Sequence, residues 1–95
     1  METKLRSVLL FDVGADVPHR LLTEATDAGV AAARASAGGL VDANGALGSA
    51  RDDKRRVRVE LALRATPAAA MEAERAFAAA FAATLETKGH AVERV

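Results

Sequence analysis

One segment of this chain alternates between apolar and polar side chains, and it limits what the chain can fold into. In residues 56–65 apolar side chains recur at every second position, and arginine or glutamate fills most positions between them. This period is that of a β-strand with one buried and one wetted face, whereas a helix repeats every ~3.6 residues. A purely helical hairpin leaves the segment unexplained, so we expect a sheet. The alternating apolar residues are Val57, Val59, Leu61 and Leu63.

Three further strands are predicted from shorter patterns. Residues 4–13 are rich in Val, Leu and Phe and suit a strand that is apolar on both faces. Residues 30–36 are mostly alanine, which fills a pleated surface poorly, so they predict only a weak strand. Residues 90–95 suit a short final strand. Between the second and third strands, Gly-Gly, Asn-Gly and Gly-Ser pairs in residues 38–53 predict a long, mobile hairpin connection.

Two helices are predicted from a capping residue followed by proline. Asp16 stands shortly before Pro18, and Thr66 stands directly before Pro67. A capping side chain accepts amide protons that the first turn leaves free, and proline lacks the N–H that would be unpaired there. Apolar residues at helical spacing continue each pattern until a glycine. The predicted helices span residues 17–28 and 67–88, and Gly29 and Gly89 are their predicted C-caps.

The two halves of the chain repeat the same order of elements: strand, capped helix, glycine, strand. Two such units in 95 residues combine most economically as a ferredoxin-like βαββαβ sandwich. This α+β fold has a four-stranded antiparallel sheet in the spatial order 4-1-3-2 and two helices on one face. The predicted domain organisation is a single domain that covers residues 1–95.

Composition restricts function. Twenty-four residues are alanine, which favours helices but adds little buried area, so we expect a thin core. Lys plus Arg equals Asp plus Glu at 13 each, which gives no global attraction for nucleic acid or membrane. The absence of cysteine excludes disulfides, zinc-thiolate sites and thiol catalysis. No signal peptide or apolar span is recognised, so we expect a cytoplasmic protein with no cofactor and no membrane partner.

Four side chains are candidates for a ligand or metal site. In the predicted topology Asp12, Asp16, His19 and His90 lie near one edge of the sheet. Two histidines and two carboxylates are ligands that a divalent metal accepts, and a histidine oriented by a carboxylate can act as an acid or base. No spacing such as HxxxH accompanies them. A metal- or small-ligand-binding regulator is therefore the alternative function, and solvated surface residues are the simpler interpretation.

The chain has one run of basic residues, between the predicted connection and the alternating strand. Its excess of positive charge suits RNA or an acidic partner. RNA-recognition domains of this topology stack bases on aromatic side chains of the central strands, and residues 56–65 contain none. We therefore interpret the run as a solvated loop that leads into a strand, and we expect no nucleic-acid partner. The run comprises Arg51, Lys54, Arg55, Arg56 and Arg58, with Asp52 and Asp53.

Strand alternation assigns the two faces of the predicted sheet. Leu5, Leu9 and Phe11 are expected to point at the helices with the apolar positions of residues 56–65. The opposite face then has apolar residues at its centre and charged residues around them, which is typical of an interface. We expect a small non-enzymatic interaction or accessory protein, either a homo-oligomer or a subunit docked through this face or an edge strand. The predicted interface residues are Arg6, Val8, Leu10, Arg34, Arg58, Glu60, Ala62 and Arg64.

Overall fold

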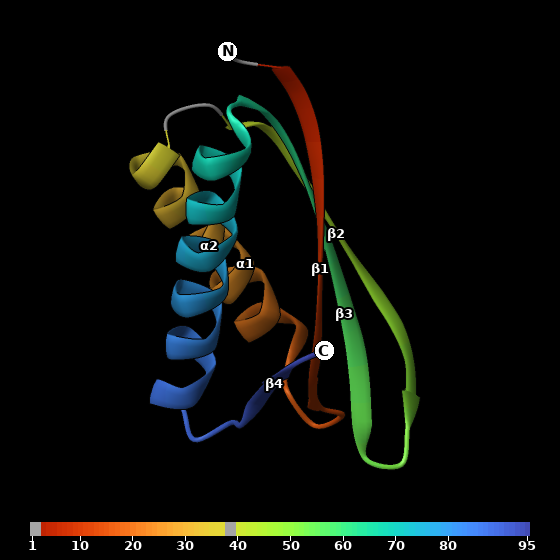
Figure 1. Cartoon of the computed structure of the whole chain (residues 1–95). Coiled ribbons are helices and arrows are strands. Elements are labelled where there is room, and N and C mark those ends of the chain that lie inside the picture. Colours follow the sequence, from red (N-terminus) through yellow and green to blue (C-terminus); the bar gives the residue numbers. More distant parts are fainter. Residues whose placement is uncertain (1–2, 38–39) are drawn as a thin grey trace.

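The computed structural model describes residues 3–37 and 40–95, which form a sheet layer and a helix layer. Figure 1 shows both helices packed on one face of the sheet, while the other face carries no helix. The chain forms β1 (Thr3–Gly14), α1 (His19–Ala37), β2 (Leu40–Arg51), β3 (Lys54–Ala65), α2 (Pro67–Thr87) and β4 (Val92–Arg94).

The strand order confirms the predicted fold. The four strands lie in the order β2-β3-β1-β4, and each neighbouring pair is antiparallel. This order, read from the other edge, is the predicted 4-1-3-2 arrangement of a ferredoxin-like sandwich. The long central pair runs without a register shift from Thr3↔Ala65 to Gly14↔Lys54. Because β1 and β3 are central, their side chains determine most of what each face of the sheet presents.

The core lies between the sheet and the two helices and depends on three aromatic rings. The Phe11 ring of β1 stacks on the Phe81 ring of α2, with ring centroids 4.4 Å apart. The ring centroids of Phe77 and Phe81 are 6.0 Å apart. Each ring is fully buried. Leu9 and the alternating residues of β3 fill the sheet side of the core, as expected. Most remaining core positions on the helices are alanine, so the core is as thin as the composition implied.

The prediction of a strand over residues 30–36 was wrong, because α1 continues through this segment to Ala37. Alanine has the highest helix propensity, and here that preference prevails over the repeat between the two halves. Gly29 is therefore not a C-cap but a buried position inside α1. A Cβ atom built on Gly29 would lie 2.7 Å from the Phe77 ring. The glycine lets α1 approach α2 closely enough to pack on that ring.

The prediction of a long mobile connection over residues 38–53 was also wrong. β2 occupies most of this range and pairs with β3, although the register shifts between Leu40 and Asp42 and between Leu47 and Ala50. The turn is confined to Asp52 and Asp53, whose φ angles are 51° and 65°. Two positive φ angles are characteristic of a type I′ hairpin turn, and Asp tolerates them better than most residues. The predicted Gly38–Gly39 turn lies outside the described residues.

The helix ends were predicted with mixed success. The Thr66 hydroxyl accepts a hydrogen bond from the Ala69 N–H at 3.2 Å, so the predicted cap of α2 is confirmed. Gly89 follows the end of α2 with a φ of 84°, as a C-terminal glycine should. α1 begins at His19 rather than Val17, and its first backbone hydrogen bonds go to the Pro18 carbonyl, so the prediction that Asp16 caps this helix was wrong. The final strand is shorter than predicted, because β4 contains only Val92–Arg94.

Among the described residues, neither α1 nor α2 combines the length and apolarity that a membrane-spanning helix needs.

The contact between Gly29 and Phe77 can be tested by adding one methyl group. We expect Gly29→Ala to lower the free energy of unfolding by about 1–3 kcal/mol, because the new Cβ overlaps the ring in a packed core. This loss should appear although alanine raises helix propensity by about 1 kcal/mol. Gly45→Ala is the matched control, since a Cβ there meets nothing within 4 Å. Chemical denaturation of both variants measures the difference, and equal stabilities would contradict the close approach of the helices.

The hairpin turn gives a second stability test. Glycine adopts positive φ without the strain that a Cβ causes, so Asp53→Gly should raise the free energy of unfolding by about 0.5–1 kcal/mol. Asp53→Ala should lower it, because alanine lacks the side-chain hydrogen bonding that helps Asp adopt this conformation. Thermal melting of the two variants beside the wild type gives the comparison. A loss of stability in both variants would show that the Asp53 side chain matters more than its backbone angle.

Candidate functional site

The open face is the face of the sheet that the helices do not cover. Strand alternation gives it the residues of β1 and β3 that point away from Leu9, Phe11 and Val59. On β1 and β3 the open face includes Lys4, Arg6, Val8, Leu10, Asp12, Lys54, Arg56, Arg58, Glu60, Ala62 and Arg64. It contains seven of the eight predicted interface residues, whose role remains a prediction. Arg34 was misplaced: it is exposed in the last turn of α1, because the segment around it is helical rather than extended.

The centre of the open face is apolar and partly exposed to solvent. Val8 is 43% exposed although it lies in the middle of a central strand, and Leu10 beside it is half-buried. In the β1–β3 register Val8 lies opposite Glu60 and Leu10 lies opposite Arg58. Each apolar side chain therefore has a charged side chain as its cross-strand neighbour.

Ion pairs surround this apolar centre. Glu60 pairs with Arg6 through one carboxylate oxygen and with Arg58 through the other, each at 3.0 Å. Arg56 donates two hydrogen bonds to the Asp12 carboxylate, at 3.0 and 3.2 Å. All these arginines are exposed, so the pairs contribute little to stability. The pairs place charged groups around Val8 and Leu10.

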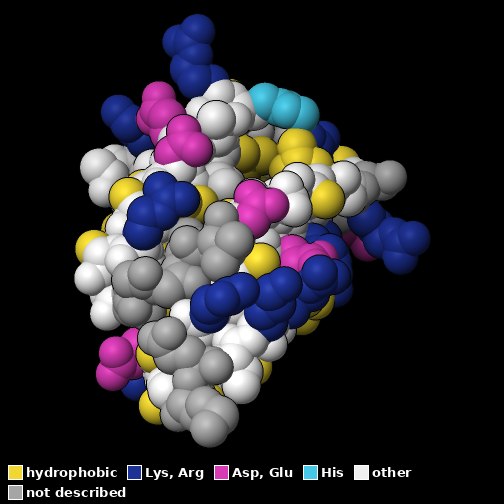
Figure 2. Space-filling model, turned by 90° about the horizontal axis from the view of Figure 1, so that it is seen from above, with side chains coloured by type: hydrophobic (Ala, Val, Ile, Leu, Met, Phe, Trp, Pro, Cys, Tyr) yellow, Lys and Arg dark blue, Asp and Glu magenta, His cyan; other side chains and the backbone are white. Residues whose placement is uncertain are grey.

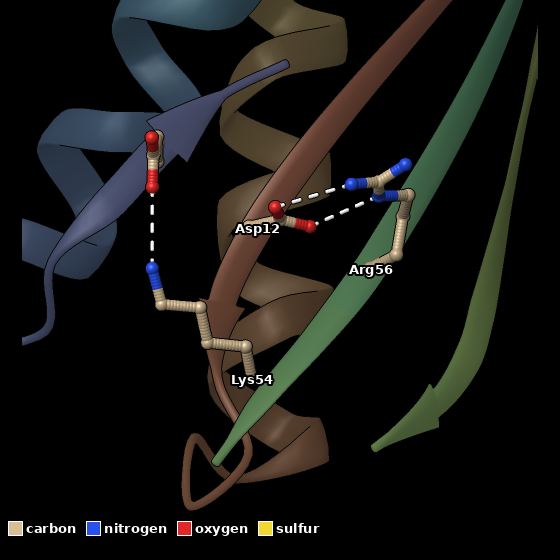
Figure 3. Close-up of polar contacts among 4 residues, drawn as sticks. Asp12, Lys54 and Arg56 are labelled. Carbon is tan, nitrogen blue, oxygen red and sulfur yellow. Dashed lines mark hydrogen bonds and ion pairs between the residues drawn. The ribbon is translucent and has the colours of Figure 1, made fainter. Parts of the chain in front are cut away.

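The Asp12–Arg56 pair lies beside a second contact that joins β4 to β3. Figure 3 shows the Asp12 carboxylate facing the Arg56 guanidinium across neighbouring strands, with the Lys54 ammonium reaching an acid on β4. That acid is Glu93, whose Oε2 lies 3.2 Å from Lys54 Nζ. Sequence reasoning missed the Asp12–Arg56 pair, because it considered Asp12 only as a candidate ligand or a solvated surface residue. The pair is identified by the β1–β3 register, which places Asp12 opposite Arg56.

The predicted basic run is divided between two faces of the sheet. Lys54, Arg56 and Arg58 alternate with Arg55, which points toward the helix side. The first two line a shallow hollow of about 490 Å³ at the hairpin end, together with Arg51 and acidic residues. In Figure 2, basic side chains stand close together beside acidic and apolar ones. The visible surface is mixed in charge rather than uniformly basic.

The four-residue edge predicted as a ligand or metal site is only partly assembled. Asp12, Asp16 and His90 line one hollow of about 520 Å³. His19 lines a different hollow, between α1 and β2, and its Nε2 lies 3.2 Å from Arg55 Nη1. Within the described ranges, 3–37 and 40–95, no three His, Asp or Glu side chains are grouped closely enough to hold a metal ion. The geometry therefore separates His19 from the other three.

Comparisons with known proteins support the fold. No protein-family model matches the chain, and no curated protein matches it. Among solved structures, the chain is similar to a C-terminal segment of the alpha subunit of aIF2 from Pyrococcus abyssi, with a TM-score of 0.61 and 12% sequence identity. The match covers 97% of this chain and 49% of that one, so this chain spans about half the length of its structural neighbour. At this identity the likeness shows the fold alone.

The Asp12–Arg56 pair predicts a pH dependence with a defined sign. Hydrogen bonds from Arg56 lower the pKa of Asp12 below its ordinary value of 3.8, and the nearby positive charges of Arg56 and Lys54 act in the same direction. Stability from the ionised carboxylate is thus present above the ordinary pKa and is lost as pH falls through the lowered one. Arg56→Gln should return the pKa of Asp12 toward its ordinary value, as measured by carboxyl NMR titration.

Arg58→Gln is the matched control for this titration, because Arg58 pairs with Glu60 and not with Asp12. It removes the same charge from the same strand and face. A pKa of Asp12 that moves equally in both variants would show that general positive charge, and not the direct hydrogen bonds, lowers it.

Proposed function

We propose that this protein is a small non-enzymatic interaction or accessory protein that associates with another protein surface through its open face. The observation that carries the proposal is the exposure of Val8 at the middle of a central strand, with Leu10 beside it. Scattered apolar residues are common on protein surfaces. Here the two are neighbours on one face of β1 and are surrounded by paired charged groups, which is the pattern of an interface with an apolar core and a polar rim.

The charges of the open face favour a second copy of the chain as the partner. Glu60 lies between two arginines, so the face has acidic and basic groups close together. An interface between two copies about a two-fold axis brings the same patch of each copy together, and it requires a self-complementary patch. A two-fold contact can pair Arg58 of one copy with Glu60 of the other while Val8 and Leu10 are desolvated. A larger partner protein that presents similar chemistry is the other form of the proposal.

Substitution of Leu10 tests the role of the open face. Leu10→Asp should weaken association by roughly tenfold or more, because it places a charge in the desolvated centre of the contact. The isolated chain should tolerate the change, since the new carboxylate would lie opposite Arg58 at the surface. Light scattering over a concentration series measures association, and circular dichroism checks the fold.

Leu9→Asp is the control from the other face of the same strand. Leu9 is 1% exposed, so a carboxylate there would be buried without a partner and should unfold the chain. Unfolding by both substitutions would contradict the exposed position of Leu10. A wild-type chain that stays monomeric at high micromolar concentration would contradict the second copy as partner.

A further inference from the structure

One edge of the sheet is only partly covered. β1 has twelve residues, but β4 pairs with it only at Phe11, Asp12 and Val13. One more hydrogen bond follows, from the Val95 N–H to the Leu10 carbonyl at 3.0 Å. Figure 1 shows β4 beside the lower part of β1 only. We call residues 3–9 of β1, on the side away from β3, the free edge.

Strand geometry identifies the backbone groups that the free edge presents. In a β-strand the N–H and C=O of one residue point to the same side, and those of the next residue point to the other side. The Leu10 carbonyl points toward β4, because it accepts from Val95. Lys4, Arg6 and Val8 therefore point their backbone N–H and C=O toward the free edge. Within the described residues, no strand pairs with these groups.

The free edge is a more regular template than the opposite edge of the sheet. The outer strand there, β2, has two register shifts along its pairing with β3. Such irregularities bend and twist an edge and discourage pairing with another strand. β1 pairs with β3 without any shift, so its free edge stays regular over its whole length.

Unbalanced positive charge flanks the free edge on the open face. Lys4 lies directly opposite Arg64 in the β1–β3 register, and both side chains are exposed. Among the ion pairs of the described residues, none involves Lys4 or Arg64. Like charges opposite each other on neighbouring strands are destabilising. Acidic side chains on an added strand would relieve this repulsion.

The helix side of the free edge has an exposed apolar residue. Met71 of α2 is 54% exposed and lies one turn before Glu74. Glu74 Oε1 lies 3.6 Å from Arg94 Nη2 of β4, which shows that this side of α2 faces the edge where β4 runs. Residues three apart on a helix share a side. Met71 is therefore on the side of α2 that faces the β4 edge, and Leu5 is the partly buried residue of the free edge on the helix side of the sheet.

A second copy does not suit this edge. Two copies could pair their free edges antiparallel about a two-fold axis. If the helix-facing residues of both copies stay on the same side of the joined sheet and β4 keeps its place, three pairing registers are possible. These registers put Arg6 opposite Arg6, Lys4 opposite Arg6, or Lys4 opposite Lys4. Each one adds a like-charge contact between the copies. The basic side chains thus disfavour self-pairing while leaving the edge open to a strand of opposite charge.

We propose that the free edge of β1 binds an extended acidic segment of another protein by strand addition. The added strand pairs with the backbone of Lys4, Arg6 and Val8. Its acidic side chains lie beside Lys4 and Arg6 on the open face, and its apolar side chains point toward Leu5 and Met71. This binding mode takes affinity from main-chain hydrogen bonds and specificity from alternate side chains. It goes beyond the proposed open-face contact, because it uses a different surface and a different partner.

The test uses a short blocked peptide in which Glu alternates with Val, and two matched peptides. The first matched peptide has Lys in place of Glu, and the second keeps Glu but has N-methyl groups on alternate backbone nitrogens. We expect the Glu peptide to bind and the other two to bind roughly tenfold more weakly or worse, as followed by fluorescence anisotropy. Amide hydrogen exchange should slow by roughly tenfold or more at Lys4, Arg6 and Val8 in the complex.

Two proline variants separate the free edge from the ladder with β3. Val8→Pro removes a donor that points to the free edge, so it should keep the fold and abolish peptide binding. Ser7→Pro removes a donor that points to β3 and should destabilise the chain. The proposal is overturned if the Glu peptide does not bind, if the N-methylated peptide binds equally well, or if exchange slows elsewhere instead. Light scattering tests the open-face association separately, so failure of either proposal is recognised independently of the other.

Discussion

The contact of Gly29 with Phe77 sets the distance between the two helices, and the rest of the core depends on that distance. The chain has only three phenylalanines, and all three stack in one cluster between β1 and α2. Alanine fills most of the remaining helix positions in the core. Small side chains give good packing only when backbones approach closely, so a glycine facing the largest ring allows an alanine-rich core to remain dense.

This arrangement uses the apolar side chains on one face of the sheet and leaves the other face without cover. Phe11 and Leu9 point into the core, and strand alternation then directs Val8 and Leu10 to the open face. The filled core and the apolar centre of the open face both arise because β1 is apolar on both faces. Ion pairs surround Val8 and Leu10, and such exposed ion pairs add little stability. The proposed association through this face is favourable because a partner would remove Val8 and Leu10 from water.

The sheet has two edges of different character. β2 is long but irregular, and β4 is so short that much of β1 keeps one side open. Basic residues flank this open part, whereas both charge signs occur around the apolar centre of the open face. The two surfaces therefore suit different partners: a second copy on the face and an acidic strand on the edge. A protein with both contacts would join two kinds of neighbour.

The sequence by itself determined the fold class, the strand order and the side of the sheet to which Leu9, Phe11, Val8 and Leu10 point. The fold class and the side-chain directions follow from local periods and capping residues, such as Thr66 before Pro67, which act over a few neighbouring residues. The strand order follows from the economical way in which two strand-helix-strand units combine. Residues 30–36 and 40–51 were assigned wrongly because helix propensity and pairing with β3 prevailed over the apparent repeat and the turn dipeptides. Only the tertiary structure decided that Gly29 packs on Phe77, that Asp12 faces Arg56, that His19 is separated from His90, and that β4 leaves an edge of β1 free. Each of these depends on register or packing between segments far apart in the chain, and no local pattern encodes such distances.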